Sequence, residues 1–213
     1  MKTPHAESDR KYDLAVVGAG PVGTSLAILA AQRGFSVVLI DARNPDITPR
    51  PDTRTFAIVR GSWRLLGATG ATADLMELIE PLNGLEAIDG GTHVFGRPSV
   101  LFTNEDLPED DDGEPLGQMV PAGALQASLD KLCAETDSLT WLRNTLFERM
   151  ETHAAGATLT LSEGRTIEAG LVAACDGMKS AVRGDAGIKT EGHDYKQSVF
   201  AANVQLSSPH HGV

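Results

Sequence analysis

The chain has 213 residues, which is long enough for one large domain or two small ones with a buried core. Hydrophobic residues make up 41% and charged residues 22%, so the composition excludes disorder, a collagen-like fibre or a coiled coil as the whole answer. The formal net charge is −11, from 18 Lys and Arg against 29 Asp and Glu. This surplus of negative charge disfavours binding to a phosphate backbone, and we expect no nucleic-acid partner.

The cysteines and the apolar segments indicate in which cellular compartment the protein is expected. The two cysteines, Cys133 and Cys175, are too few for a disulfide framework and lack metal-ligand spacing, which favours reduced thiols. The first residues contain no apolar segment after their charges, and the longest apolar run, Leu26–Ala31, is far shorter than the roughly 18 residues of a membrane span. We therefore expect a cytoplasmic protein without a secretion signal or a membrane-spanning helix.

The most informative segment is an apolar strand that leads into a glycine-rich turn. Leu14–Val17 predicts a strand buried on both faces, followed directly by Gly18-Ala19-Gly20-Pro21-Val22-Gly23, a GxGxxG pattern. Pro21 suits the first position of a helix, which we expect to run to Arg33 and to end at Gly34 in a left-handed conformation. The larger apolar side chains would then share one face of this helix: Val22, Leu26, Leu29 and Ala30.

A second strand and an acidic residue complete the nucleotide-binding pattern. Ser36–Ile40 is a β-branched run that ends at Asp41, close to the spacing of about 20 residues at which a ribose-binding acid follows such a turn. A carboxylate there would accept hydrogen bonds from ribose hydroxyls and repel a 2′-phosphate. This favours FAD or NAD over NADP as the tightly bound nucleotide. The alternative interpretation is a tight turn between a core strand and a helix, with Asp41 as an ordinary loop acid.

After Asp41 the regular alternation of strands and helices stops. Residues 42–54 form a loop rich in Pro and Arg, where a dehydrogenase would continue with further βαβ units. The later segments predict a helix over Thr55–Leu66, a strand over Gly91–Thr103, a helix over Ala122–Glu135 and two or three short strands over Leu146–Glu168. We therefore expect an α/β fold, a Rossmann-like domain interrupted by a mixed α+β insertion.

A second strand, turn and helix follows this insertion. Ala169–Cys175 is an apolar run of strand length, Asp176-Gly177 follows it, and Ser180–Gly184 is helix-like. Alone, this could be an ordinary turn between a strand and a helix. In combination with the upstream turn, a carboxylate at the carboxyl end of a strand, beside a glycine, is well placed to reach a cofactor that lies over the sheet.

These motifs, in this order, resemble the FAD-dependent aromatic hydroxylases of the para-hydroxybenzoate hydroxylase type. The resemblance is carried by the glycine-rich turn, Asp41, Asp52-Thr53-Arg54, and Cys175-Asp176-Gly177 with Ser180 and Arg183. The segment from Tyr195-Lys196-Gln197-Ser198 through Ala201, Asn203 and Val204 to His210 is similar to the ubiquinone-biosynthesis branch of that family. The resemblance extends from about residue 12 to residue 211.

The resemblance implies a set of cofactor-binding residues, and no residue is assigned as catalytic or as a metal ligand. It places Gly18, Gly20 and Gly23 at the ADP half of FAD, Asp41 on the adenosine ribose with Arg43 beside it, Arg54 near the pyrophosphate, Gln118 on the cofactor, and Asp176 with Gly177 near the pyrophosphate and ribityl chain. Without the resemblance, Gln118 and Gln126 would be interpreted as surface residues.

The implied activity is hydroxylation of a phenolic or aromatic ring by FAD, with O2 and a transient NADPH or NADH. The substrate would be an aromatic intermediate of ubiquinone biosynthesis, with or without a polyprenyl chain. This leaves open peripheral attachment to the inner membrane or membership of a multi-enzyme complex. Two alternatives remain: a non-catalytic assembly module with an FAD-type fold, and a flavin-dependent halogenase or isoprenoid reductase.

The sequence departs from the family pattern at two places. Relatives have an arginine where this chain has Gly123, and a further downstream Gly-Asp motif is missing. We therefore expect a truncated chain: the FAD-binding domain over 1–100, an excursion toward the substrate domain over 101–120, the rest of the FAD-binding domain over 121–190, and the incomplete start of a substrate domain over 191–213. The acidic run 105–114 is expected to be a solvated loop.

Overall fold

A computed structural model of the chain describes residues 11–47, 52–89, 91, 98–103, 106, 113–199, 202, 204 and 207. The chain divides into two compact units. The first unit comprises Met1–Arg50 and Gln126–Ser198, and the second comprises Pro51–Leu125 and Val199–Val213. Most of the acidic run 105–114 lies outside the described residues.

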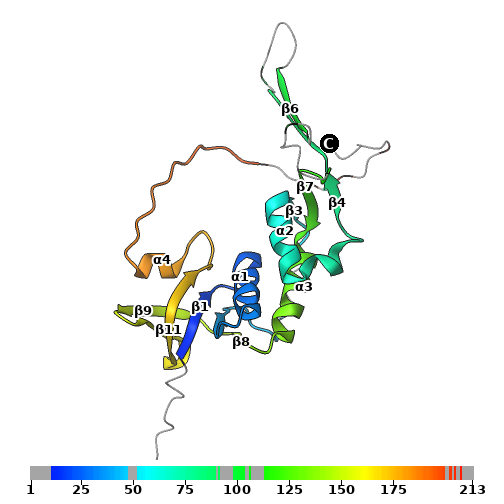
Figure 1. Cartoon of the computed structure of the whole chain (residues 1–213). Coiled ribbons are helices and arrows are strands. Elements are labelled where there is room, and N and C mark those ends of the chain that lie inside the picture. The colour runs from blue at the N-terminus through cyan, green and yellow to red at the C-terminus, as the bar shows by residue number, and fades with distance from the viewer. Residues whose placement is uncertain are drawn as a thin grey trace, which may run out of the picture. The chain divides into compact units, whose positions relative to one another are not determined.

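The first unit is built on a six-stranded sheet with the order β8-β2-β1-β11-β10-β9. The strands β8, β2, β1 and β11 are parallel to their neighbours, whereas β10 and β9 extend the sheet as an antiparallel edge. Figure 1 shows β1 beside β11. The bounds are β1 Lys11–Val17, β2 Val37–Ile40, β8 Leu139–Leu142, β9 Phe147–His153, β10 Gly156–Leu161 and β11 Thr166–Ala174.

The register of the parallel strands decides where the motifs of the sequence meet. Val17, the last residue of β1, lies opposite Ile40 on one side and Ala174 on the other. Parallel strands have their carboxyl ends at the same edge of a sheet, so the segments that follow β1, β2 and β11 are neighbours there. The core beneath this edge is apolar and fully buried at Ala15, Val38 and Leu159, among others.

Helix α1 (Pro21–Gln32) connects β1 to β2, and Gly34 after it has the expected left-handed conformation, with φ of 87°. Its buried residues are mostly small: Gly23, Thr24, Ser25, Ala27, Ile28 and Ala31. By contrast, Val22 and Leu26, on the face expected to gather the larger apolar side chains, are 74% and 37% exposed. The small residues face the core because they let the helix approach the sheet closely.

In the described part of the first unit, helices α3, η3 and α4 follow α1 along the chain. Helix α3 (Ala122–Glu135) has the predicted bounds, and its residues from Gln126 onward lie in this unit. The 3-10 helix η3 (Ser162–Gly164) joins β10 to β11. Helix α4 (Ala181–Asp185) follows β11 and contacts β9, and its Asp185 carboxylate accepts a hydrogen bond of 2.8 Å from the Met150 backbone N–H.

The second unit has a three-stranded antiparallel sheet with the order β3-β7-β4 and a separate β5–β6 hairpin. Its strands are β3 Thr55–Val59, β4 Glu80–Leu82, β5 Gly84–Ile88, β6 Ser99–Thr103 and β7 Gly117–Pro121. Helix α2 (Arg60–Thr69) and the 3-10 helix η1 (Ala71–Leu75) follow β3. Of the strand-like segment expected over Gly91–Thr103, Ser99–Thr103 forms β6, while Gly91 and Pro98 lie outside any strand.

The predicted helix over Thr55–Leu66 is wrong in its first five residues. Thr55–Val59 is strand β3, which pairs with β7 from Thr55 opposite Pro121 to Val59 opposite Gly117. The run contains β-branched and aromatic residues that favour a strand once a partner is present, and the pairing with β7 comes from residues far away in the sequence. The helix begins only at Arg60.

Among the described residues, no helix combines the length and the apolar character that crossing a membrane requires.

Candidate functional site

The glycine-rich turn links β1 to α1, and its glycines differ in their surroundings. Gly18 has φ of +102°, and a Cβ atom there would overlap with the Cys175 carbonyl. A Cβ atom on Gly23 would overlap with the Gly18 carbonyl. Around Gly20, however, a Cβ atom would meet nothing within 4 Å. The first and third glycines therefore allow close packing, whereas the second leaves open space beside the start of α1. The hydrogen bonds within α1 begin with the Thr24 N–H, which donates to the Gly20 carbonyl at 2.9 Å, so the Val22 and Gly23 N–H groups lie ahead of them at the helix start.

The structure brings the two turns of the sequence into contact. The Cys175 backbone N–H donates a hydrogen bond of 2.8 Å to the Val17 carbonyl, which continues the β1–β11 pairing into the turns. Gly18 packs against the backbone of Cys175 and Asp176. Burial, followed by the negative charge of Asp176, raises the pKa of the Cys175 thiol, so the thiol stays protonated at neutral pH.

Asp176 caps helix α4 with one oxygen and leaves the other without a partner. Its Oδ2 accepts hydrogen bonds from the backbone N–H groups of Ala181 at 2.6 Å and Val182 at 3.2 Å. Its Oδ1 is buried and has no hydrogen-bond partner among the described residues. Partial burial acts to raise the pKa of Asp176, but hydrogen bonds from the Ser180 hydroxyl and the α4 backbone outweigh burial and hold it below its ordinary value. The result is a fixed carboxylate with a free acceptor oxygen.

Asp41 follows β2 directly and lies at the same edge of the sheet. Its backbone N–H donates to the Leu142 carbonyl at 2.8 Å, and the residue is only 4% exposed. Both carboxylate oxygens accept from Arg43: Oδ1 from the backbone N–H at 3.0 Å and Oδ2 from Nε at 2.8 Å. Each oxygen retains further lone-pair capacity, so Asp41 can still accept from ribose hydroxyls.

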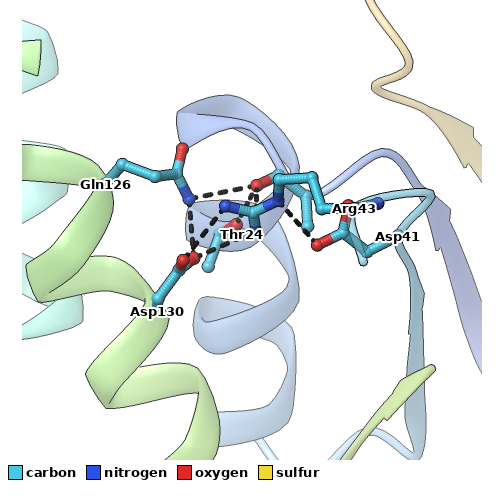
Figure 2. Close-up of polar contacts among 6 residues, drawn as sticks. Thr24, Asp41, Arg43, Gln126 and Asp130 are labelled. Atoms are coloured by element: carbon cyan, nitrogen blue, oxygen red, sulfur yellow. Dashed lines mark hydrogen bonds and ion pairs between the residues drawn. The ribbon is translucent and has the colours of Figure 1, made fainter. Parts of the chain in front are cut away.

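Arg43 connects Asp41 to helix α3 (Figure 2). Its Nη1 and Nη2 donate to the two oxygens of Asp130 at 3.0 and 3.1 Å. Burial acts to lower the pKa of Arg43, but the hydrogen bond and charge of Asp130, with those of Asp41, outweigh burial and raise it. Sequence reasoning did not identify Asp130 and took Gln126 for a surface residue. The signal that could have found them is their spacing of four residues, which places both on one face of α3.

Two cavities adjoin these residues. One of about 210 Å³ is bordered by Gly18, Thr145, Asp176 and Lys179, and it runs past the ends of β1 and β2. The other, of about 570 Å³, is lined by Asp41, Arg43 and Asp130 together with Trp141 and Arg143. The Arg143 guanidinium lies 3.7 Å from the centre of the Trp141 ring. In the part of the chain that the structure describes, no group of three or more His, Cys, Asp or Glu side chains could hold a metal ion.

The structure thus packs Gly18 against Asp176 and Gly23 against Gly18, and Gly177 follows Asp176 in the second turn with φ of +85°. Gly20, Asp41 and Arg43 lie at the same edge of the first unit. Arg54 and Gln118 belong to the second unit. Arg54 precedes β3 and forms a fork with Asp52, at 2.9 Å from Nε and 2.7 Å from Nη2, and this hydrogen bonding lowers the pKa of Asp52 to about 2. Gln118 lies on β7 opposite Ile58. For these two residues, cofactor binding stays a prediction.

Gly123, where the resemblance predicts an arginine, lies in the first turn of α3. A Cβ atom there would lie 3.3 Å from the Asp52 carbonyl oxygen, a tight contact, so the local backbone fits a glycine.

A parallel sheet with a GxGxxG turn, an acid after the second strand and a second glycine turn at the same edge defines a dinucleotide-binding α/β protein. The chain belongs to the FAD-binding domain family, which matches residues 11–211. Its cofactor is therefore FAD, as the sequence predicted.

Relatives extend this assignment. The chain is 30% identical over 207 residues to the ubiquinone hydroxylase UbiL of Rhodospirillum rubrum, covering 96% of this chain and 46% of that protein. It is also 30% identical over 205 residues to the 3-demethoxyubiquinol 3-hydroxylase of Escherichia coli, covering 94% of this chain and 50% of that protein. The chain spans about half the length of these relatives.

Among solved structures, the fold matches PqsL, a probable FAD-dependent monooxygenase from Pseudomonas aeruginosa, with a TM-score of 0.63 and 19% identity. The match covers 87% of this chain and 48% of that one. The predicted Rossmann-like FAD-binding fold and the resemblance to the ubiquinone-biosynthesis hydroxylases are both confirmed.

Proposed function

We propose that this chain is the FAD-binding part of a monooxygenase that hydroxylates an aromatic ring, with an intermediate of ubiquinone biosynthesis as the substrate. The observation that carries the proposal is the contact between the glycine-rich turn and the Cys175-Asp176-Gly177 turn, with Asp41 at the same sheet edge. The identity of 30% with two ubiquinone-pathway hydroxylases supports this choice of substrate class.

The residues at this edge fit an adenine dinucleotide. Gly20 leaves open space beside the N-terminus of α1, where backbone N–H groups and the helix dipole favour a diphosphate. Asp41 would accept hydrogen bonds from the adenosine ribose. The buried, unpartnered Oδ1 of Asp176 offers an acceptor for a ribityl hydroxyl. Lys179 borders the cavity of about 210 Å³ together with Asp176 and supplies positive charge for a phosphate. Arg54 and Gln118 remain proposed contacts from the second unit.

When bound, FAD would supply the redox chemistry: two electrons from NADPH or NADH would reduce O2, so that one oxygen atom enters the ring and the other leaves as water. The residues described here bind and orient the cofactor; none of them is assigned as a catalytic acid or base. A polyprenylated substrate would favour association with a membrane surface or a multi-enzyme complex, and both belong to this proposal.

The first test is cofactor binding by the whole chain. We expect titration with FAD to quench flavin fluorescence at a ratio of one FAD per chain. Asp41→Asn should weaken FAD binding about tenfold, because a neutral amide is a weaker acceptor for ribose hydroxyls. The control Asp137→Asn, which removes an exposed carboxylate from the same unit, should leave binding unchanged. A purified chain that takes up no FAD would contradict the proposal.

The second test is product analysis. The FAD-loaded protein, with the rest of the proposed monooxygenase joined to this chain, is incubated with NADPH or NADH, a phenolic ubiquinone-pathway ring and ¹⁸O₂, and the mass of the product is measured by mass spectrometry. One added ¹⁸O atom per ring is the expected result. A product that gains two hydrogens, or a halogen when halide is present, would instead support a reductase or a halogenase.

A further inference from the structure

Three side chains donate hydrogen bonds to a single carbonyl in the glycine-rich turn. The Ala19 oxygen accepts from Thr24 Oγ1, Arg43 Nη2 and Gln126 Nε2, each at 3.1 Å. A carbonyl oxygen has two lone pairs, so three side-chain donors saturate it. The donors come from α1, from the segment after β2 and from α3, as Figure 2 shows. The peptide between Ala19 and Gly20 is therefore held by parts of the chain that are far apart in sequence.

The orientation of this peptide matters because a trans peptide is planar, with its carbonyl and the following N–H pointing in opposite directions. Holding the Ala19 carbonyl toward Arg43 and Gln126 thus turns the Gly20 N–H to the other side. A Cβ atom on Gly20 would meet nothing within 4 Å, so this residue borders open space. A donor fixed in advance loses little entropy when a phosphate oxygen arrives.

Asp130 accepts hydrogen bonds from two of the three side chains that donate to the Ala19 carbonyl. Its Oδ1 accepts from Gln126 Nε2 at 2.7 Å and from Arg43 Nη2 at 3.1 Å, while its Oδ2 accepts from Arg43 Nη1 at 3.0 Å. The Arg43 guanidinium is therefore shared between two carboxylates, with its fork on Asp130 and its Nε on Asp41. The Asp130 side chain is 31% exposed, so it can be replaced without opening the core.

We propose that Asp130 is a positioning residue of the nucleotide site, which holds Arg43 and Gln126 on the Ala19 carbonyl and keeps the guanidinium from enclosing Asp41. Without the Asp130 charge, Arg43 turns both donor edges to Asp41 and competes with ribose hydroxyls for its oxygens. The Ala19–Gly20 peptide also loses two of its restraints. Arg43 then acts through Asp41 and Ala19 rather than as a direct ligand. This inference rests on the proposed FAD binding.

The test compares Asp130→Asn with Glu135→Gln, a matched control that removes one exposed negative charge from the same helix. The probes are FAD, ADP and 2′,3′-dideoxy-ADP, which lacks the ribose hydroxyls. We expect Asp130→Asn to weaken FAD and ADP binding about tenfold, and dideoxy-ADP binding only about threefold. Glu135→Gln should stay within about twofold for all three. A variant that only loosened the fold would lose the three ligands equally.

A double-mutant cycle tests the route through Arg43. If Asp130 acts through the guanidinium, Asp130→Asn adds little to the loss already caused by Arg43→Gln, and the two changes are not additive. Additive losses would contradict this route. Should Asp130→Asn fail to fold by circular dichroism, Gln126→Ala replaces it, because it removes only one donor from Ala19 and one from Asp130. We expect about a threefold loss for ADP and dideoxy-ADP alike.

The outcomes separate the two proposals. If the Asp130→Asn and Gln126→Ala variants bind FAD and ADP as tightly as Glu135→Gln does, the positioning role is overturned. The proposal that the chain binds FAD is then unaffected. An unmodified chain that binds neither FAD nor ADP overturns the proposed function, and the positioning role with it.

Discussion

The three glycines of the GxGxxG turn have different physical tasks. Gly18 and Gly23 are required by packing, since any side chain would overlap with backbone already in place. Gly20 is in an extended conformation, with φ of −72° and ψ of 176°, which any residue can adopt, and its surroundings are open. Its value therefore lies in leaving space for a ligand rather than in the stability of the fold.

This difference predicts opposite results for two matched substitutions. Gly18→Ala should destabilise the chain by about 3 kcal/mol, because a methyl group meets the Cys175 carbonyl at a positive φ. Gly20→Ala should change the free energy of unfolding by less than about 1 kcal/mol, since a weaker helix cap and a less flexible unfolded chain offset each other. It should nevertheless weaken FAD binding at least about tenfold. Urea unfolding and FAD titration measure the two effects, and equal destabilisation would contradict the assignment.

The residues of the nucleotide-binding motif could be predicted from the sequence, whereas the hydrogen-bond partners that hold them could not. The glycines and Asp41 stood in a pattern whose spacing is dictated by the nucleotide. Asp130 carries no such pattern, because it contacts Arg43 only after α3 has come to lie beside the glycine-rich turn. The same holds for Gln126, whose two hydrogen bonds are invisible along the chain.

At the scale of elements, the pairing of β1 with β11 is decisive. It joins two strand–turn–helix units that the sequence separates by about 150 residues, and its register places Val17 opposite Ala174. Helix α4 then depends on the turn after β11 for its start, because Asp176 and Ser180 both accept hydrogen bonds from its first backbone N–H groups.

The capping role of Asp176 predicts a pH dependence. Its pKa is lowered in the folded chain from an ordinary value of 3.8. The ionised carboxylate therefore stabilises the fold at pH values above 3.8, and this stabilisation is lost as the pH falls through the lowered pKa. Because Asp176 is only partly buried, solvent screens its charge, and the contribution should be under about 1 kcal/mol.

Urea unfolding between pH 7 and pH 3 measures this effect for the unmodified chain, Asp176→Asn and the control Asp137→Asn. The Asp176→Asn chain should lose less stability below pH 4 than the other two, while the three should change in parallel above pH 5. Parallel curves over the whole range would show that Asp176 contributes nothing through its charge.

At the scale of the whole molecule, the segment between β2 and α3 forms most of a second unit with its own antiparallel sheet. The sequence indicated this interruption through the loss of regular alternation after Asp41. The segment Gln126–Ser198 returns to the first unit, where β8, β9 and β10 complete the sheet that contains the nucleotide-binding turns.

This organisation predicts that FAD stabilises the chain through the first unit. At a free FAD concentration of 100 times its dissociation constant, the free energy of unfolding should rise by about 2.7 kcal/mol, since the ligand binds only the folded state. The shift of the urea midpoint with and without FAD measures it. At that same concentration Gly20→Ala should show a clearly smaller shift, and an equal shift would argue for binding elsewhere.

The sequence alone determined the class of this protein, because a diphosphate imposes glycines, a helix start and an acid at fixed spacings that are all local. It also determined most elements of the first unit, whose apolar runs and turns are strong signals. Only the tertiary structure decided that Thr55–Val59 is a strand, that the two glycine turns touch, and that Asp130 and Gln126 take part in the site. Each of these depends on partners distant in the chain, and such contacts exist only once the chain has folded.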